Sequence, residues 1–154
     1  MTRGNPVSEI EPGFFYGFER LMTFHCDECE LGPTLLEGSF AFVGSFPYIL
    51  LVHNGMASLE PGAFSGFPTN AYINLIENDI ANISEESFRP IVEVLSLGGG
   101  SIGLEGSPVV CDCSMAWLAL NPGFLESVSG RCIDGTLFSD LVPEDFQDCV
   151  VFDQ

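Results

Sequence analysis

The sequence ILLVHNGMASL at positions 49–59 is followed 24 residues later by INLIENDIANI at positions 73–83. Both stretches place apolar residues at their first, third, eighth and eleventh positions and an asparagine at the sixth. A phenylalanine follows each stretch at the same offset, Phe64 in one and Phe88 in the other. This part of the chain therefore repeats one structural unit.

The order L-x-L-x-x-N-x-L-x-x-L, at a period of about 20–29 residues, is the signature of leucine-rich repeats. Its first two apolar residues are the inward side chains of a short strand, because strand side chains alternate between two faces. The asparagine turns the chain, and its amide can satisfy backbone groups that would otherwise be unpaired. One unit cannot bury its own apolar face, so units must stack. The sequence predicts an α/β repeat fold, a right-handed leucine-rich repeat solenoid with one short curved parallel sheet of about four strands.

We expect the repeats to occupy residues 24–106, in complete units that begin near Phe24, Ile49, Ile73 and Leu95. In the fourth unit Leu97, Gly100 and Ile102 would take the inward places, and the glycines at 98–100 would leave its strand poorly specified. Behind the strands we expect loops, turns and 3₁₀ segments. The phenylalanines there should form one buried column of Phe40, Phe64 and Phe88.

Residues 1–23 contain only the back half of a repeat, in which Ile10, Phe15, Phe18 and Leu21 lack a strand of their own. A repeat array needs a capping unit with a polar outer face at each end. We therefore expect the edge of the first strand to be open, and we expect the chain to self-associate through this end or to fray there first.

Residues 107–149 differ from the repeats and are expected to form a C-terminal cysteine cap, followed by a tail at 150–154. The segment contains Cys111-Asp112-Cys113, then Trp117-Leu118, then Cys132 and Cys149. Ser114 is expected to cap a helix that runs through Leu120, and Asn121-Pro122 to stop it and start a second short helix. Four cysteines allow three disulfide connectivities, and the sequence alone leaves all three open.

The C-x-C and W-L motifs, with the two later cysteines, resemble the C-terminal cap of extracellular leucine-rich repeat proteins. Phe88-Arg89-Pro90, the run from Cys111 to Pro122 and the run from Cys132 to Phe146 are similar to one arthropod group. That group contains the proteins related to the non-catalytic subunit of the shrimp enzyme Oplophorus-luciferin 2-monooxygenase. The resemblance implies disulfides Cys111–Cys132 and Cys113–Cys149, and a leucine-rich subunit that does not carry the chemistry.

Composition and charge exclude several classes of function. The net charge of −18, with only four Lys and Arg residues, argues against nucleic-acid binding, which needs a basic surface. The longest apolar stretch, at 40–52, is interrupted by Gly44, Ser45 and Pro47, so we expect no membrane span. The first six residues lack the apolar segment of a signal peptide. Six cysteines suggest an oxidising compartment, and hence a secreted or extracellular protein. Asn82 begins a glycosylation sequon and should be exposed.

The repeat register places outward-facing side chains in columns across the sheet, and we expect this concave face to bind a protein partner. Its columns in the first three units are His25, Leu50 and Asn74; Asp27, Val52 and Ile76; and Glu28, His53 and Glu77. The fourth unit would add Ser96, Gly98 and Gly99 to these columns.

Two clusters of reactive side chains favour structural roles. Glu28, His53 and Glu77 resemble a metal or pH-sensing site, but we favour a solvated ladder of ion pairs on a binding face, or contact with a partner, and we expect no metal. Cys26 and Cys29 form a C-x-x-C motif, which is redox-active at a helix N-terminus. Here the register places them on a strand and a turn, as buried thiols or a local disulfide.

We expect no cofactor and no catalytic site, because no Ser or Cys joins a His and an acid in any register that the repeat allows. The leading expectation is a non-enzymatic scaffold or accessory subunit of a secreted complex. A receptor or pattern-recognition ectodomain fragment is the alternative among binding proteins. An oxygenase acting on a luciferin-like substrate is the alternative among enzymes.

Overall fold

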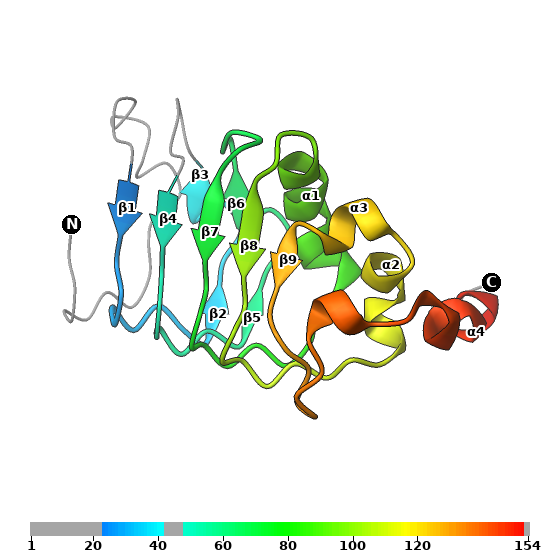
Figure 1. The fold of residues 1–154 in the computed structure, drawn as a ribbon. Coiled ribbons are helices and arrows are strands. Elements are labelled where there is room, and N and C mark those ends of the chain that lie inside the picture. The colour runs from blue at the N-terminus through cyan, green and yellow to red at the C-terminus, as the bar shows by residue number, and fades with distance from the viewer. Residues whose placement is uncertain (1–22, 42–47, 153–154) are drawn as a thin grey trace.

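The computed structural model describes residues 23–41 and 48–152 and is organised on one parallel sheet (Figure 1). Its five strands lie in the order β1-β4-β7-β8-β9. They are β1 (Thr23–His25), β4 (Tyr48–Leu50), β7 (Tyr72–Asn74), β8 (Ser101–Gly103) and β9 (Val128–Ser129). The fifth strand belongs to the region expected to be only a cap, so the sheet extends one strand further than the expected four.

In β4, β7 and β8 the middle residue is the inward one. Phe24 pairs with Ile49, Ile49 with Ile73, and Ile73 with Ile102. The isoleucines are fully buried in the hydrophobic core, and the next inward places are taken by the equally buried Leu51, Leu75 and Leu104. This is the alternation expected of strands that cover a core with one face only.

Two small parallel sheets lie outside the main one. The first joins β2 (Thr34–Leu35) to β5 (Ser58–Leu59), and the second joins β3 (Phe40–Ala41) to β6 (Phe64–Ser65). Phe40 and Phe64 face each other as stacked rings with centroids 5.0 Å apart. Phe88 is also buried, but it comes from a helix. The sequence analysis expected loops at these positions and missed both small sheets.

The fourth unit differs from the expectation. Residues from Glu85 to Ser96 form α1, the longest helix among the described residues, and the strand follows only at Ser101–Gly103. Ile73 therefore pairs with Ile102 and not with Leu95, whose side chain is buried on the helix. Gly98–Gly100 make the turn after the helix. A Cβ at Gly100 would lie 2.6 Å from the carbonyl oxygens of Thr69 and Ala71, so this turn packs directly on the preceding unit.

Buried amides join consecutive units at the turn after each strand. Asn54 accepts hydrogen bonds from the backbone N–H of Cys29 (2.7 Å) and donates to the carbonyl of Cys26 (2.9 Å). Asn78 accepts from the N–H groups of Asn54 and Met56 and donates to carbonyls of both its own and the preceding unit. Ser107 takes the corresponding place in the next unit and accepts from the N–H of Ile80. Each side chain thus satisfies backbone groups of the unit before it.

The C-terminal region is built of short helices beside the β9 end of the sheet (Figure 1). They are the 3₁₀ segments η2 (Cys113–Met115), η3 (Phe138–Asp140) and η4 (Pro143–Phe146), and the helices α2 (Ala116–Ala119), α3 (Pro122–Leu125) and α4 (Gln147–Phe152). Trp117 is buried and donates from its indole N–H to the carbonyl of Ile83, which ties this region to the units before it.

Asp112, and not Ser114, caps the first helical turn: its carboxylate accepts from the Ser114 N–H at 2.9 Å. The expected stop and restart at Asn121-Pro122 is present, with Asn121 as the N-cap of α3.

Disulfides join Cys111 to Cys132 and Cys113 to Cys149, the pairing that the family resemblance implies. A third disulfide joins Cys26 to Cys29. Of the described helices, none combines the length and apolarity needed to cross a membrane. The expectations for the segment before Thr23, including the open edge and the self-association, lie outside the described residues.

Candidate binding face

The outward side chains of the main sheet and of the turns after its strands form one surface, here called the open face. Four columns run across it: Tyr48, Tyr72 and Ser101; His25, Leu50, Asn74 and Gly103; Asp27, Val52, Ile76 and Glu105; and Glu28, His53, Glu77 and Gly106. All nine residues expected from the sequence lie in these columns, and none of them is fully buried. The expected Ser96, Gly98 and Gly99 are wrong, because Gly103, Glu105 and Gly106 occupy those places.

The centre of the open face is apolar. Leu50, Val52 and Ile76 are half-buried and lie on adjacent rungs. Tyr48 is 51% exposed, and Tyr72 lies beside it in the sheet. We call these five residues the apolar strip. The sequence analysis missed both tyrosines, although each directly precedes an inward isoleucine and strand alternation turns it outward.

One imidazole on the face is held by a neighbouring carboxylate. His25 Nε2 lies 2.5 Å from Asp27 Oδ2, and the other oxygen of Asp27 accepts from the Val52 N–H at 2.7 Å. Asp27 therefore connects two strands through its backbone contact and fixes the ring of His25. This carboxylate has its hydrogen-bonding partners within the protein and is less available to a ligand.

The column of Glu28, His53 and Glu77 has an unusual backbone. These residues have φ values of 57°, 59° and 60°, in the left-handed region that favours glycine, and the fourth place of the column is occupied by Gly106 at 87°. His53 Nδ1 lies 3.8 Å from Glu77 Oε2, and both side chains are about two-thirds exposed. Three consecutive units thus place a long, solvated side chain at a position whose backbone conformation is less strained for glycine.

A polar cluster closes the other end of the face. Glu105 Oε1 accepts from the hydroxyl of Ser129 at 3.1 Å, and the Tyr72 hydroxyl lies over the bare backbone of Gly103. Burial raises the pKa of Tyr72, and the nearby Glu105 carboxylate raises it further. Tyr72 therefore stays protonated and can donate a hydrogen bond.

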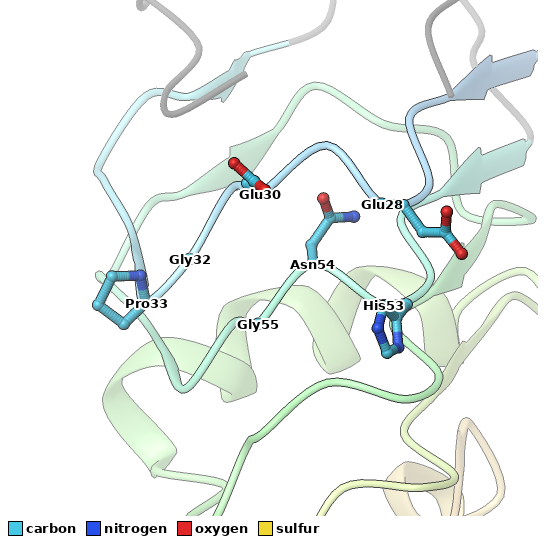
Figure 2. A pocket seen from close by; sticks show the side chains of 7 residues that line it. All are labelled: Glu28, Glu30, Gly32, Pro33, His53, Asn54 and Gly55. Atoms are coloured by element: carbon cyan, nitrogen blue, oxygen red, sulfur yellow. The ribbon is translucent and has the colours of Figure 1, made fainter. Parts of the chain in front are cut away.

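An open hollow of about 680 Å³ continues the face beyond the ends of β1 and β4. Its walls are Glu28, Glu30, Gly32, Pro33, His53, Asn54 and Gly55. Figure 2 shows Glu28 and His53 at the end nearest the strands and Pro33 at the opposite end. The amide of Asn54 is engaged with backbone groups, so the side chains left to meet a ligand are the two carboxylates and the imidazole.

A second hollow lies in the C-terminal region, between the two disulfides and four aspartates: Asp112, Asp134, Asp140 and Asp145. Asp112 and Asp134 are engaged in turns, because each accepts from a backbone N–H two residues later. Those hydrogen bonds lower the pKa of both carboxyl groups. Throughout residues 23–41 and 48–152, no group of three or more His, Cys, Asp or Glu side chains is placed to hold a metal ion.

The C-x-x-C motif is structural in its placement. Cys26 and Cys29 are buried, and Cys29 occupies the turn position that Asn54 and Asn78 occupy in later units. The sequence reading left a disulfide and free thiols open, and the structure has the disulfide. Asn82 of the sequon is exposed and lies two residues before Ser84, the N-cap of α1.

No protein-family model matches this chain, and a search of curated proteins returns no match.

Proposed function

We propose that this protein is a non-enzymatic scaffold or accessory subunit of a secreted complex that binds a protein partner on its open face. Within this proposal the fold is a right-handed leucine-rich repeat solenoid with a cysteine cap, and the protein functions like the arthropod non-catalytic subunits that its sequence resembles. The observation that carries the proposal is the open face itself, a sheet surface with an apolar centre and a charged margin.

The composition of the open face supports protein binding. A cluster of tyrosines and aliphatic side chains surrounded by polar groups is typical of the central part of a protein interface. Here Tyr48 and Tyr72 supply the aromatic rings, and Glu28, His53 and Glu77 supply the polar margin on the turn side.

The rigidity of the surface supports the same function. The strands that carry the face are fixed by the buried amides of Asn54 and Asn78 and by the Cys26–Cys29 disulfide beside β1. A surface that is already ordered loses little conformational entropy when a partner binds.

The three disulfides are compatible with an oxidising, extracellular setting, because disulfides persist there and are rare in the cytosol. Glycosylation at Asn82 is part of the proposal, since the residue is exposed outside any helix or strand.

Site-specific photocrosslinking tests the proposed function. A photoreactive amino acid is placed at Ile76, in the centre of the open face, and in a matched protein at Glu93, which is exposed on α1. Both proteins are incubated with extract of the source tissue. We expect a discrete crosslinked protein from position 76 and none from position 93. Equal crosslinking from both positions, or crosslinking from position 93 alone, would overturn the proposal.

A further inference from the structure

We propose that the partner segment bound on the open face is an extended, basic stretch of polypeptide, with aliphatic side chains on the apolar strip and Arg or Lys side chains on the carboxylates beside it. This inference rests on the proposed function and specifies the chemistry of the partner.

The charge of the open face favours a basic partner. Glu28, Glu77 and Glu105 line the open face, and Glu30 lines the hollow that continues it. The four cationic residues of the chain are Arg3, Arg20, Arg89 and Arg131, of which the structure describes the last two. Arg89 is paired with Glu85 and Glu93 on α1, and Arg131 follows β9 and donates to the carbonyl of Gly135. A partner that buries these carboxylates must supply positive charge, because unpaired carboxylates are costly to desolvate.

The apolar strip distinguishes this surface from an ordinary solvated row of acidic side chains. Leu50, Val52 and Ile76 lie on two adjacent strands and their following turns, directly beside the column of Glu28, His53 and Glu77. A ligand of cations alone would leave these aliphatic groups in water. A segment that carries both aliphatic and cationic side chains covers both.

The hollow beside the face favours a long cationic side chain. It opens where the column of Glu28 and His53 ends, and its lining includes Gly55, where a Cβ would meet no atom within 4 Å. Glu28 and Glu30 are among the residues that line it, and Figure 2 shows their carboxylates pointing to different sides. The hollow can therefore take the long side chain of an Arg or Lys from a segment lying on the strip, with its charge near one of these carboxylates.

The dimensions set the length of the segment. Neighbouring strands lie about 4.8 Å apart, so the four strands from β1 to β8 span about 15 Å, which about five extended residues cover at ~3.3 Å each. A short linear stretch is enough to cross the face.

The test uses a defined probe, a fluorescein-labelled synthetic peptide of about ten residues in which Arg and Leu alternate, so that an extended chain has one apolar and one basic side. Binding is followed by fluorescence anisotropy. A peptide in which Ser replaces every Leu keeps the charge, and one in which Glu replaces every Arg keeps the apolar side. We expect the Arg–Leu peptide to bind at least tenfold more tightly than either comparison peptide.

Two double variants with the same change in net charge separate local recognition from the general attraction of an acidic protein. Glu28→Gln with Glu77→Gln removes two carboxylates from the face, whereas Glu86→Gln with Glu126→Gln removes two exposed ones from α1 and from the end of α3. We expect about a fivefold to tenfold weaker affinity for the first pair and less than a twofold change for the second. Equal losses for both pairs, or no loss for the first, would overturn the inference.

A third variant distinguishes failure of this inference from failure of the proposed function. Val52→Ser with Ile76→Ser removes the centre of the apolar strip at half-exposed positions. It is tested against the partner found by crosslinking. Loss of that partner with the serine pair, but not with the glutamine pair, would show that the face binds a protein that is not basic. Loss with both pairs supports the inference, and retention with both would overturn the proposed function itself.

Discussion

The unit between β4 and β7 and the unit between β7 and β8 place their strands in the same register by different routes. Ile49 pairs with Ile73 and Ile73 with Ile102, so the first unit takes 24 residues and the second takes 29. The first returns through the short strands β5 and β6, and the second returns through the twelve-residue helix α1. The strand and the turn after it are therefore the constant part of the unit, and the return path is the variable part.

The physical reason lies in the contacts each part must make. A strand has to match its neighbour residue for residue, and the turn amide has to reach backbone groups of the preceding unit. The return segment only has to cover the core with apolar side chains, which Phe64 does from a strand and Phe88 from a helix. Tests that compare the two units can separate these roles.

The largest effect is expected from Phe64→Ala. The ring is 4% exposed and stacks on Phe40, so its loss leaves a cavity between two strands of different units. The free energy of unfolding should fall by about 3–5 kcal/mol. Leu36→Ala, at an exposed site in the same region, should change it by less than about 0.5 kcal/mol. Chemical denaturation measures both, and equal values for the two variants would contradict the assigned core.

Removal of a disulfide should cost more stability at the C-terminal end of the molecule than at the β1 end. The Cys113–Cys149 bridge spans 36 residues and the Cys26–Cys29 bridge spans 3. In the chain-entropy model the longer loop contributes about 4 kcal/mol and the shorter about 2 kcal/mol. Alanine double variants at each pair, compared by denaturation, should show this order. The reverse order would mean that local packing of the Cys26–Cys29 turn outweighs loop entropy. Mass mapping under non-reducing digestion checks the pairing, and a Cys111–Cys149 peptide would refute it.

The turn side chain that makes more hydrogen bonds should contribute more to the free energy of unfolding. The Asn78 side chain accepts two hydrogen bonds from backbone groups and donates three, whereas the Ser107 hydroxyl accepts one. Asn78→Ala should lower the free energy of unfolding by about 3 kcal/mol and Ser107→Ala by about 1 kcal/mol, since buried backbone groups lose their partners. Hydrogen exchange at the amides of Asn54 and Met56 should accelerate in the first variant only.

The smallest effect is expected on the stability of the fold at acid pH. Hydrogen bonds from Ser114 hold the pKa of Asp112 below its ordinary value, so this carboxylate stabilises the fold above its unfolded pKa of about 3.8. That contribution is lost as the pH falls through the folded pKa. Between about pH 6 and pH 2, Asp112→Asn should show a smaller drop in melting temperature than the wild type. Identical pH profiles for the variant and the wild type would contradict the link.

The sequence by itself determined the inward residues of β4 and β7, the buried turn amides of Asn54 and Asn78, and the nine side chains placed on the open face. All of these follow from local periodicity, because strand alternation and a fixed repeat assign each residue to a face whatever packs behind it. The separate C-terminal region was also evident from its cysteines, although the pairing came from a family resemblance.

Only the tertiary structure decided where the strand of the fourth unit lies, that a fifth strand joins the sheet, and that Gly103, Glu105 and Gly106 complete the columns of the open face. Leu95 and Leu97 satisfy the leucine spacing, yet Leu95 is buried on a helix and Leu97 is exposed. A short apolar run fits a strand or a helix equally well, and the choice depended on the turn of Gly98–Gly100 packing against Thr69 and Ala71. Val128 joined the sheet because β8 presents a free edge that the C-terminal region covers, and no local pattern in the sequence records that edge.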